Sequence, residues 1–251
     1  MGILRVSKFE NRAIPVPGRA YVAEDYIPRD GYRAPAGLVL DGSEDPRLQQ
    51  ALRLLRIALR LAAPVLLLLV LLSAVYLYAD AGIPAAWLPL WAQGYGLGVS
   101  DLVLPGCWTL IHLTNRRFGP AYAFGQLVAA LALGALVALI NPGDIRNWLP
   151  DMAALSWRGV LSFFLVFGIA NFVAIVAFDG ARGRRWWSAP LAASIAASFV
   201  YCGLYYPLAF GMLGAAALAH FVLFLGVSAA LLGPYWLLRP AMRPLPGMNG
   251  Y

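Results

Sequence analysis

Four polar side chains interrupt long apolar stretches of the sequence, and they are the residues best suited to form a functional site. Asp101 and His112 lie in one stretch, Asn171 in another and His220 in the last. Stretches of this length are typical of membrane spans. Polar groups inside a span are costly and usually functional, because hydrocarbon offers them no hydrogen-bonding partner.

Asp101 and His112 are expected on nearly the same face of one helix. Eleven residues separate them, which corresponds to about 1100° of rotation, within ~20° of a whole number of turns, and to about 16 Å along the axis. Trp108 lies close to this stripe and Asn115 continues it. The pattern predicts a wall for a planar, hydrogen-bonding solute, to which Asn171 is added as a fifth substrate-binding residue.

The same residues also have structural interpretations. Asp101 comes at the beginning of its helix, after "GYGLGVS", where a carboxylate suits the amino end. His112 lies about one turn from the other end, where it could bond a neighbouring carbonyl. The sequence has no nucleophile–base pair, Walker loop or cluster of metal ligands. We therefore expect no enzyme activity, no metal and no cofactor.

The composition indicates an integral membrane protein. Of 251 residues, 61% are hydrophobic and 12% are charged, and the mean hydropathy is +0.70, whereas a soluble domain is about half apolar and a quarter charged. We expect an all-α bundle of six transmembrane helices over residues 61–238, each near the ~20 residues that a bilayer requires. The six runs are roughly Leu61–Ala79, Leu97–Leu113, Ala121–Ile140, Gly159–Phe178, Ala189–Gly211 and Ala215–Leu238.

The positions of the arginines predict the orientation. The net charge is +7, and of the nineteen basic residues only Arg146 and Arg158 fall outside if the amino terminus is cytoplasmic. We expect a multi-pass protein of the bacterial inner membrane, with both termini in the cytoplasm and a short C-terminal tail at 239–251. An arginine pair would hold the turn between the second and third helices, a ligand-binding role being its alternative. The expected interface anchors are Arg116, Arg117, Arg184, Arg185, Trp186 and Trp187.

Small residues recur at four-residue spacing on the fifth helix, as Ala193 with Ala197 and Ser194 with Ser198. This spacing lets helix backbones approach closely in a membrane. The two cysteines, Cys107 and Cys202, both fall in apolar runs, and we expect them to be buried packing residues without a disulfide.

Residues 1–45 differ from the remainder, being rich in Pro and Gly with charges of both signs. Such a segment cannot build a core of its own, so we expect an extended cytoplasmic tail. It is either free or lies as a strap on a partner protein. The strap would bind through Tyr21, Tyr26 and Tyr32.

Residues 46–60 are expected to form an amphipathic helix that begins at Pro46. One face carries leucines, among them Leu48, Leu52 and Leu55, and the arginines lie largely elsewhere. We expect this helix to lie on the inner leaflet and then to turn into the first span. Docking to a partner protein is the alternative.

Two stretches resemble a known family. "LTNRRFGPAYA" (113–123) and "FDGARGRRWWSAPLAASIAASFVYCGLYYPLAFG" (178–211) are similar to motifs of the queuosine-precursor transporters, also called the vitamin uptake transporter family. The resemblance covers roughly residues 85–238. It implies a six-helix fold, the same orientation and uptake of a deazapurine such as 7-cyano-7-deazaguanine.

Three departures from the family pattern decide the functional expectation. His112, Ala174 and Tyr201 stand where family members carry acids, and acids inside spans are what a transporter uses to bind ions and solutes. With these acids replaced and a tail added, we expect a non-catalytic accessory subunit of a larger membrane complex, of respiratory or photosynthetic type, docked through its tail. The alternative is a secondary uptake transporter for a queuosine precursor or a similar small planar solute.

Overall fold

The computed structural model of the chain describes residues 46–79, 81–140, 157–183, 185–211 and 213–244. Three expectations lie outside these residues: the tail at 1–45 with its three tyrosines, the segment around Arg146, and the anchor Arg184. The side chain of Leu48 is also outside the description.

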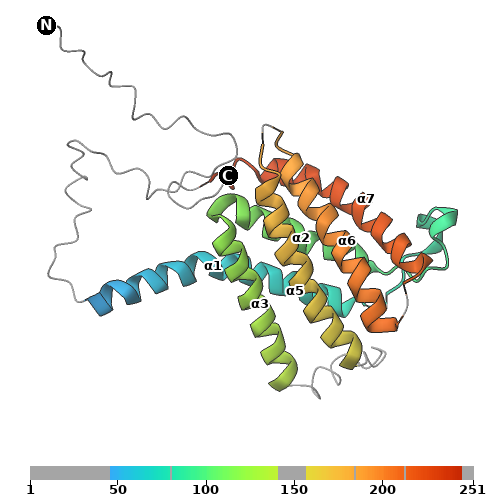
Figure 1. Cartoon of the computed structure of the whole chain (residues 1–251), viewed down its shortest axis with the longest axis horizontal. Coiled ribbons are helices and arrows are strands. Elements are labelled where there is room, and N and C mark those ends of the chain that lie inside the picture. The colour runs from blue at the N-terminus through green and yellow to red at the C-terminus, as the bar shows by residue number, and fades with distance from the viewer. Residues whose placement is uncertain (1–45, 80, 141–156, 184, 212, 245–251) are drawn as a thin grey trace, which may run out of the picture.

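The described residues form a bundle of helices (Figure 1). Four helices are long and apolar enough to cross a membrane, namely α1, α5, α6 and α7. This confirms the expectation of an all-helical chain with the character of a multi-pass membrane protein. The helices are α1 (Pro46–Leu77), α2 (Val99–Phe118), α3 (Pro120–Ile140), α5 (Trp157–Gly180), α6 (Ser188–Phe210) and α7 (Ala215–Leu238), with short 3-10 helices η2 (Ala85–Trp87) and η3 (Leu90–Ala92).

Helix α2 occupies the centre of the bundle and contacts each of the other five helices. It carries Asp101 near its beginning and Arg116 and Arg117 in its last turn, so it is more polar than its neighbours. A polar helix is stable in the centre only because its side chains find partners on the surrounding helices.

The expected break between an interfacial helix and the first span is absent. Helix α1 continues from Pro46 to Leu77 with Pro64 inside it, because the leucine-rich sequence contains no glycine or other stop signal at residue 60. Gln126 of α3 donates its Nε2 hydrogen to the carbonyl of Pro64 at 2.9 Å. In Figure 1 the N-terminal half of α1 extends away from the other helices.

Helix α2 ends five residues later than expected. Asn115 and Arg116 are buried, so the polar sequence after Leu113 continues the helix instead of leaving it. The helix stops at Gly119, whose φ of +85° suits glycine, and α3 begins at Pro120. The predicted tight turn between these helices is therefore confirmed.

The loop between α1 and α2, which we call the cap (residues 81–98), folds over one end of the bundle. Its two ends are joined where Ile83 N–H donates to the Leu97 carbonyl at 2.9 Å and Val99 N–H to the Ala81 carbonyl at 2.7 Å. Ala92 and Leu97 pack in one cluster with Ala219 of α7. The cap residues and Ala79 line a cavity of about 330 Å³.

The small residues of α6 lie where close packing requires them. Ala193, Ser194, Ala197 and Ser198 are all buried, and α6 packs most extensively against α5. Cys107 and Cys202 are buried free thiols, as predicted.

Candidate functional site

The residues predicted to form one stripe do lie along α2, and most of them point into the bundle. Trp108, His112 and Asn115 are fully buried, and so is Asn171 on the neighbouring α5. Asp101 is only partly buried, because it lies in the first turn of α2 beneath the cap. The structure therefore divides the predicted stripe into an interior part and a part at the capped end.

Asp101 caps its own helix. Its Oδ2 accepts the backbone N–H of Gly98 at 2.7 Å, which satisfies one of the free N–H groups at a helix start. The structural interpretation of this carboxylate is therefore confirmed. The same Oδ2 also lies 3.2 Å from Nε2 of His220 on α7, so Asp101 does more than cap.

His220 is the residue that sequence reasoning left out of the site. It had been recognised as a polar group in the last span but had no predicted partner. Asp101 and His220 both lie in the first two turns of their helices. Two helices that begin at the same end of a bundle place such residues at a similar height, and this is the sequence signal that could have paired them. Which two helices are neighbours could not be read from one sequence.

His112 is held between α6 and α5. Its Nε2 lies 3.3 Å from the Ser194 hydroxyl, and its ring stacks on Phe178 with centroids 5.6 Å apart. The partner of His112 Nε2 is therefore a hydroxyl of another helix, and not the neighbouring backbone carbonyl that the structural interpretation expected. Nδ1 of His112 has no hydrogen-bond partner among the described residues.

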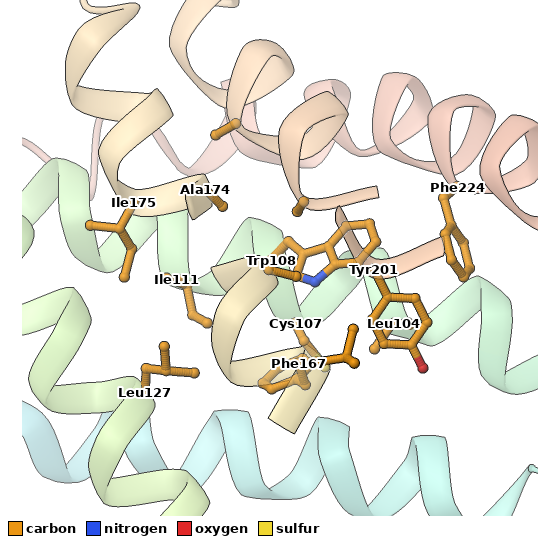
Figure 2. Close-up of a cluster of buried hydrophobic side chains, with 14 of the residues drawn as sticks. Leu104, Cys107, Trp108, Ile111, Leu127, Phe167, Ala174, Ile175, Tyr201 and Phe224 are labelled. Atoms are coloured by element: carbon orange, nitrogen blue, oxygen red, sulfur yellow. The ribbon is translucent and has the colours of Figure 1, made fainter. Parts of the chain in front are cut away.

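Trp108 lies in the middle of the buried cluster (Figure 2). Its ring meets Phe224 edge-on at 5.4 Å and Tyr201 at 6.3 Å between centroids. The indole Nε1–H is buried and has no acceptor within the described part of the chain. Tyr and Trp usually find a partner for their polar atom when buried, so this donor is unusual.

Asn171 is another of the buried side chains with an atom that has no hydrogen-bond partner among the described residues. Its Nδ2 donates to the Phe167 carbonyl of its own helix at 2.8 Å, while its Oδ1 accepts no hydrogen bond from any described residue. The core thus contains an indole donor, an amide acceptor and an imidazole nitrogen without partners. Each such group costs about 1–3 kcal/mol when left unpaired.

Asn115 belongs to a different cluster at the opposite end, which we call the arginine end (Arg116, Arg117, Arg182, Arg185 and Arg239). Its Nδ2 donates to the Ile175 carbonyl at 3.4 Å, and its Oδ1 accepts from Arg182 at 3.2 Å. Arg182 also pairs with Asp179 at 2.5 Å. Asn115 is therefore engaged in structural hydrogen bonds, as Asp101 is, and differs in this from Trp108, His112 and Asn171.

The anchoring residues lie at this same end. Arg117 donates to the carbonyl of Ala241, after α7, and Arg116 is buried close to the Tyr235 hydroxyl. Arg185 lies over the ring of the exposed Trp187 at 5.7 Å. The arginine pair thus ties the turn after α2 to α7, as a structural role predicts. Trp186 is half-buried.

The three positions that depart from the family pattern converge in the interior. Ala174 and Tyr201 belong to the same buried cluster as Trp108 (Figure 2), and His112 stacks on Phe178 of that cluster. Within the described ranges, no three His, Cys, Asp or Glu side chains gather as metal ligands would. Comparisons with protein-family models, with curated proteins and with solved structures give no match.

Proposed function

We propose that this chain is a secondary uptake transporter for a small, planar, hydrogen-bonding solute, and that a deazapurine such as 7-cyano-7-deazaguanine is a suitable one. The observation that carries this proposal is the set of unpartnered buried atoms: Trp108 Nε1, His112 Nδ1 and Asn171 Oδ1. Unpaired polar groups in a membrane interior destabilise a fold. A bound ligand that forms hydrogen bonds with these atoms would account for their presence in the interior.

The chemistry of these atoms suits an uncharged heterocycle. Trp108 supplies a donor, Asn171 an acceptor, and His112 Nδ1 either one according to its tautomer. Aromatic rings border these atoms, because Phe178 stacks on His112 and Tyr201 meets Trp108 edge-on. A neutral purine-like solute needs donors and acceptors more than it needs acids, so the replacement of the family's acids at His112 and Tyr201 is compatible with binding.

The orientation follows from the charges. We propose six membrane-crossing helices, with the more polar α2 and the shorter apolar α3 completing the four already described. The arginine end then lies in the cytoplasm and the cap outside, in a bacterial inner membrane. Solute would enter from the capped end and leave at the arginine end.

This proposal reverses the preference drawn from sequence. That preference rested on the loss of acids inside the spans and on the added N-terminal tail. The interior retains buried polar side chains, which are His112, Asn115, Gln126, Asn171, Ser194 and Ser198, and an acid–histidine pair. Loss of function is therefore not required to account for the substitutions.

Rescue of a bacterial strain that lacks precursor uptake tests the proposal. The strain would express this chain and receive 7-cyano-7-deazaguanine, and queuosine in its tRNA would be measured. Restored queuosine supports transport. No restoration by a chain that is folded and present in the membrane would refute a deazapurine as the solute.

The second candidate function is an accessory subunit, and the exposed half of α1 favours it. Leu52 and Leu55 are exposed together with the apolar residues around them, on a helix that extends away from the bundle (Figure 1). An apolar surface of this kind covers either lipid or protein. Purification from native membranes in mild detergent separates the two, because a subunit would migrate with its partners and not as a lone 27.1 kDa chain.

A further inference from the structure

Asp101 and His220 connect the beginnings of α2 and α7 directly beneath the cap. His220 Nε2 lies 3.2 Å from Asp101 Oδ2, and both side chains are largely buried. Leu97 of the cap packs in one cluster with Ala219, the residue before His220. A movement that separates α2 from α7 at this end must break the contact between these two side chains.

The hydrogen bonds around the pair require it to hold a proton. His220 Nδ1 lies 2.8 Å from the Ala216 carbonyl, and because a carbonyl only accepts, Nδ1 must carry a hydrogen. In a neutral imidazole Nε2 is then a bare acceptor that faces the oxygen of Asp101. Two acceptors repel, so the 3.2 Å contact is attractive only with one proton between the two atoms.

The position of that proton follows from the helix cap. Asp101 Oδ2 already accepts the Gly98 N–H at 2.7 Å, which stabilises the ionised carboxylate. The proton therefore resides on Nε2 of His220, and the closed contact is a carboxylate–imidazolium pair. Histidine is the side chain whose charge ordinarily changes near neutral pH.

We propose that Asp101 and His220 form a proton-binding gate: binding of one proton from the capped side closes α2 against α7, and its loss opens that contact. The inference rests on the proposed transport function and deepens it, since it names the proton as the ion coupled to uptake. The closed, protonated gate is the state expected after solute and proton have entered together from outside.

A chain of ring contacts links the gate to the proposed solute site. His220 meets Phe224 at 6.2 Å between centroids, and Phe224 meets Trp108 at 5.4 Å. Tyr206 also lies against His220, at 5.1 Å. A displacement of His220 on loss of its proton would therefore shift Phe224 and, through it, the indole ring of Trp108.

The other titratable groups that the structure describes near the gate are tyrosines, a cysteine and an arginine. Those of α6 that lie within range of the Asp101 charge are Tyr201, Cys202, Tyr205 and Tyr206. α1 and the cap bring exposed tyrosines to this end, namely Tyr76, Tyr78 and Tyr95. Tyrosines and thiols are ordinarily neutral at pH 7, and Arg158 at the same end donates to the Leu208 carbonyl.

The gate can be followed without any solute by the distance between the capped ends of α2 and α7. Spin labels would be attached to cysteines introduced at the exposed Leu102 and Leu218, in full-length protein in liposomes whose buried native cysteines are replaced by alanine. Double electron–electron resonance would be recorded at about pH 5.5 and about pH 9, on either side of the ordinary titration of histidine. The distance should be short and narrow at the lower pH and longer at the higher pH.

Asp101→Asn is the decisive variant. Its amide oxygen can take the place of Oδ2, which contacts both the Gly98 N–H and His220 Nε2, but it has no negative charge to hold the imidazolium. Closure at the lower pH should then be lost, so that the distance is long at both pH values, and a pH gradient should no longer accelerate uptake. Asp179→Asn, the same chemical change at the arginine end, is the matched control and should keep the pH-dependent distance.

The two failures are distinguishable. A pH-independent distance in the parent protein would overturn the gate even if solute is transported, and so would an Asp101→Asn protein that closes at the lower pH like the parent. A pH-dependent distance that Asp101→Asn abolishes supports the gate, even if no deazapurine is taken up. If the labelled variants fold poorly, hydrogen exchange of the α2 and α7 amides in the unlabelled protein can be compared at the two pH values instead. An open gate should show faster exchange at the capped ends of these helices.

Discussion

Asn171 offers the sharpest residue-scale test of the solute site. Replacing it by leucine removes the amide that bonds the Phe167 carbonyl together with the unpartnered oxygen. Because a buried acceptor without a partner is destabilising, we expect Asn171→Leu to change the free energy of unfolding by less than about 1 kcal/mol, or to raise it. Uptake should fall roughly tenfold or more, since each 1.4 kcal/mol of lost binding is a factor of ten.

Thermal unfolding in detergent and solute uptake in vesicles would be measured together for this variant. Thr109→Val is the control, because that hydroxyl donates to the Pro105 carbonyl of its own helix and to no other described residue. An Asn171→Leu protein that unfolds far more easily but transports normally would contradict a binding role for the amide.

Trp108 separates packing from binding through two substitutions. Trp108→Phe keeps most of the ring contacts with Phe224 and Tyr201 but removes the indole donor, so it should fold and lose uptake. Trp108→Ala should lose about 3–5 kcal/mol of stability through the cavity it leaves. Near-normal uptake by Trp108→Phe would show that the donor is not used.

Residue positions along one helix were predictable, whereas contacts between helices were not. The helical repeat alone placed Asp101, Trp108 and His112 on one side of α2, and burial of the last two followed. The pairing of Asp101 with His220 and of His112 with Ser194 depends on which helices are neighbours and how they are rotated. One sequence contains no direct record of either.

At the scale of elements, Gly119 is the position at which backbone conformation decides the fold. Its φ of +85° and ψ of 174° join α2 to α3, a backbone conformation that is essentially restricted to glycine. We expect Gly119→Ala to lower the free energy of unfolding by about 1–3 kcal/mol. Gly203→Ala is the matched control, because Gly203 lies within α6 with open space around it and alanine favours a helix.

Chemical unfolding of both variants in the same detergent would measure the difference. The explanation fails if Gly119→Ala is as stable as the parent, or if Gly203→Ala is the more damaged of the two. Gly119 directly follows the last turn of α2, which contains Arg116 and Arg117. The two variants therefore test how the arginine end is built.

Element boundaries were predicted best where apolar sequence ends at a glycine or a charged segment. The last span, Ala215–Leu238, matches α7, because glycine precedes it and arginine follows it. The second span was predicted to end too early, at Leu113, because Arg116 and Arg117 were assigned to the loop although both lie in the last turn of α2 and Arg116 is buried. The break expected at residue 60 was wrong because amphipathic and fully apolar sequence can form one continuous helix.

For the whole molecule, the proposed orientation puts the cap outside the inner membrane and the arginine end in the cytoplasm. Leu90 in the cap and Arg185 at the arginine end are both exposed, while the native thiols are buried. A membrane-impermeant maleimide should label Leu90→Cys in intact cells after outer-membrane permeabilisation. Arg185→Cys should react only once the inner membrane is opened. Labelling in the reverse order would overturn the proposed orientation and, with it, the direction from which the gate receives its proton.

Equilibrium binding of radiolabelled 7-cyano-7-deazaguanine to the purified, folded protein is the sharpest test of the proposed solute site. We expect saturable binding that Asn171→Leu and Trp108→Phe each weaken roughly tenfold or more, as expected for loss of a hydrogen bond to a buried partner. The absence of saturable binding to the parent protein, or equal binding by both variants, would contradict the assignment of Trp108, His112 and Asn171 as the solute site.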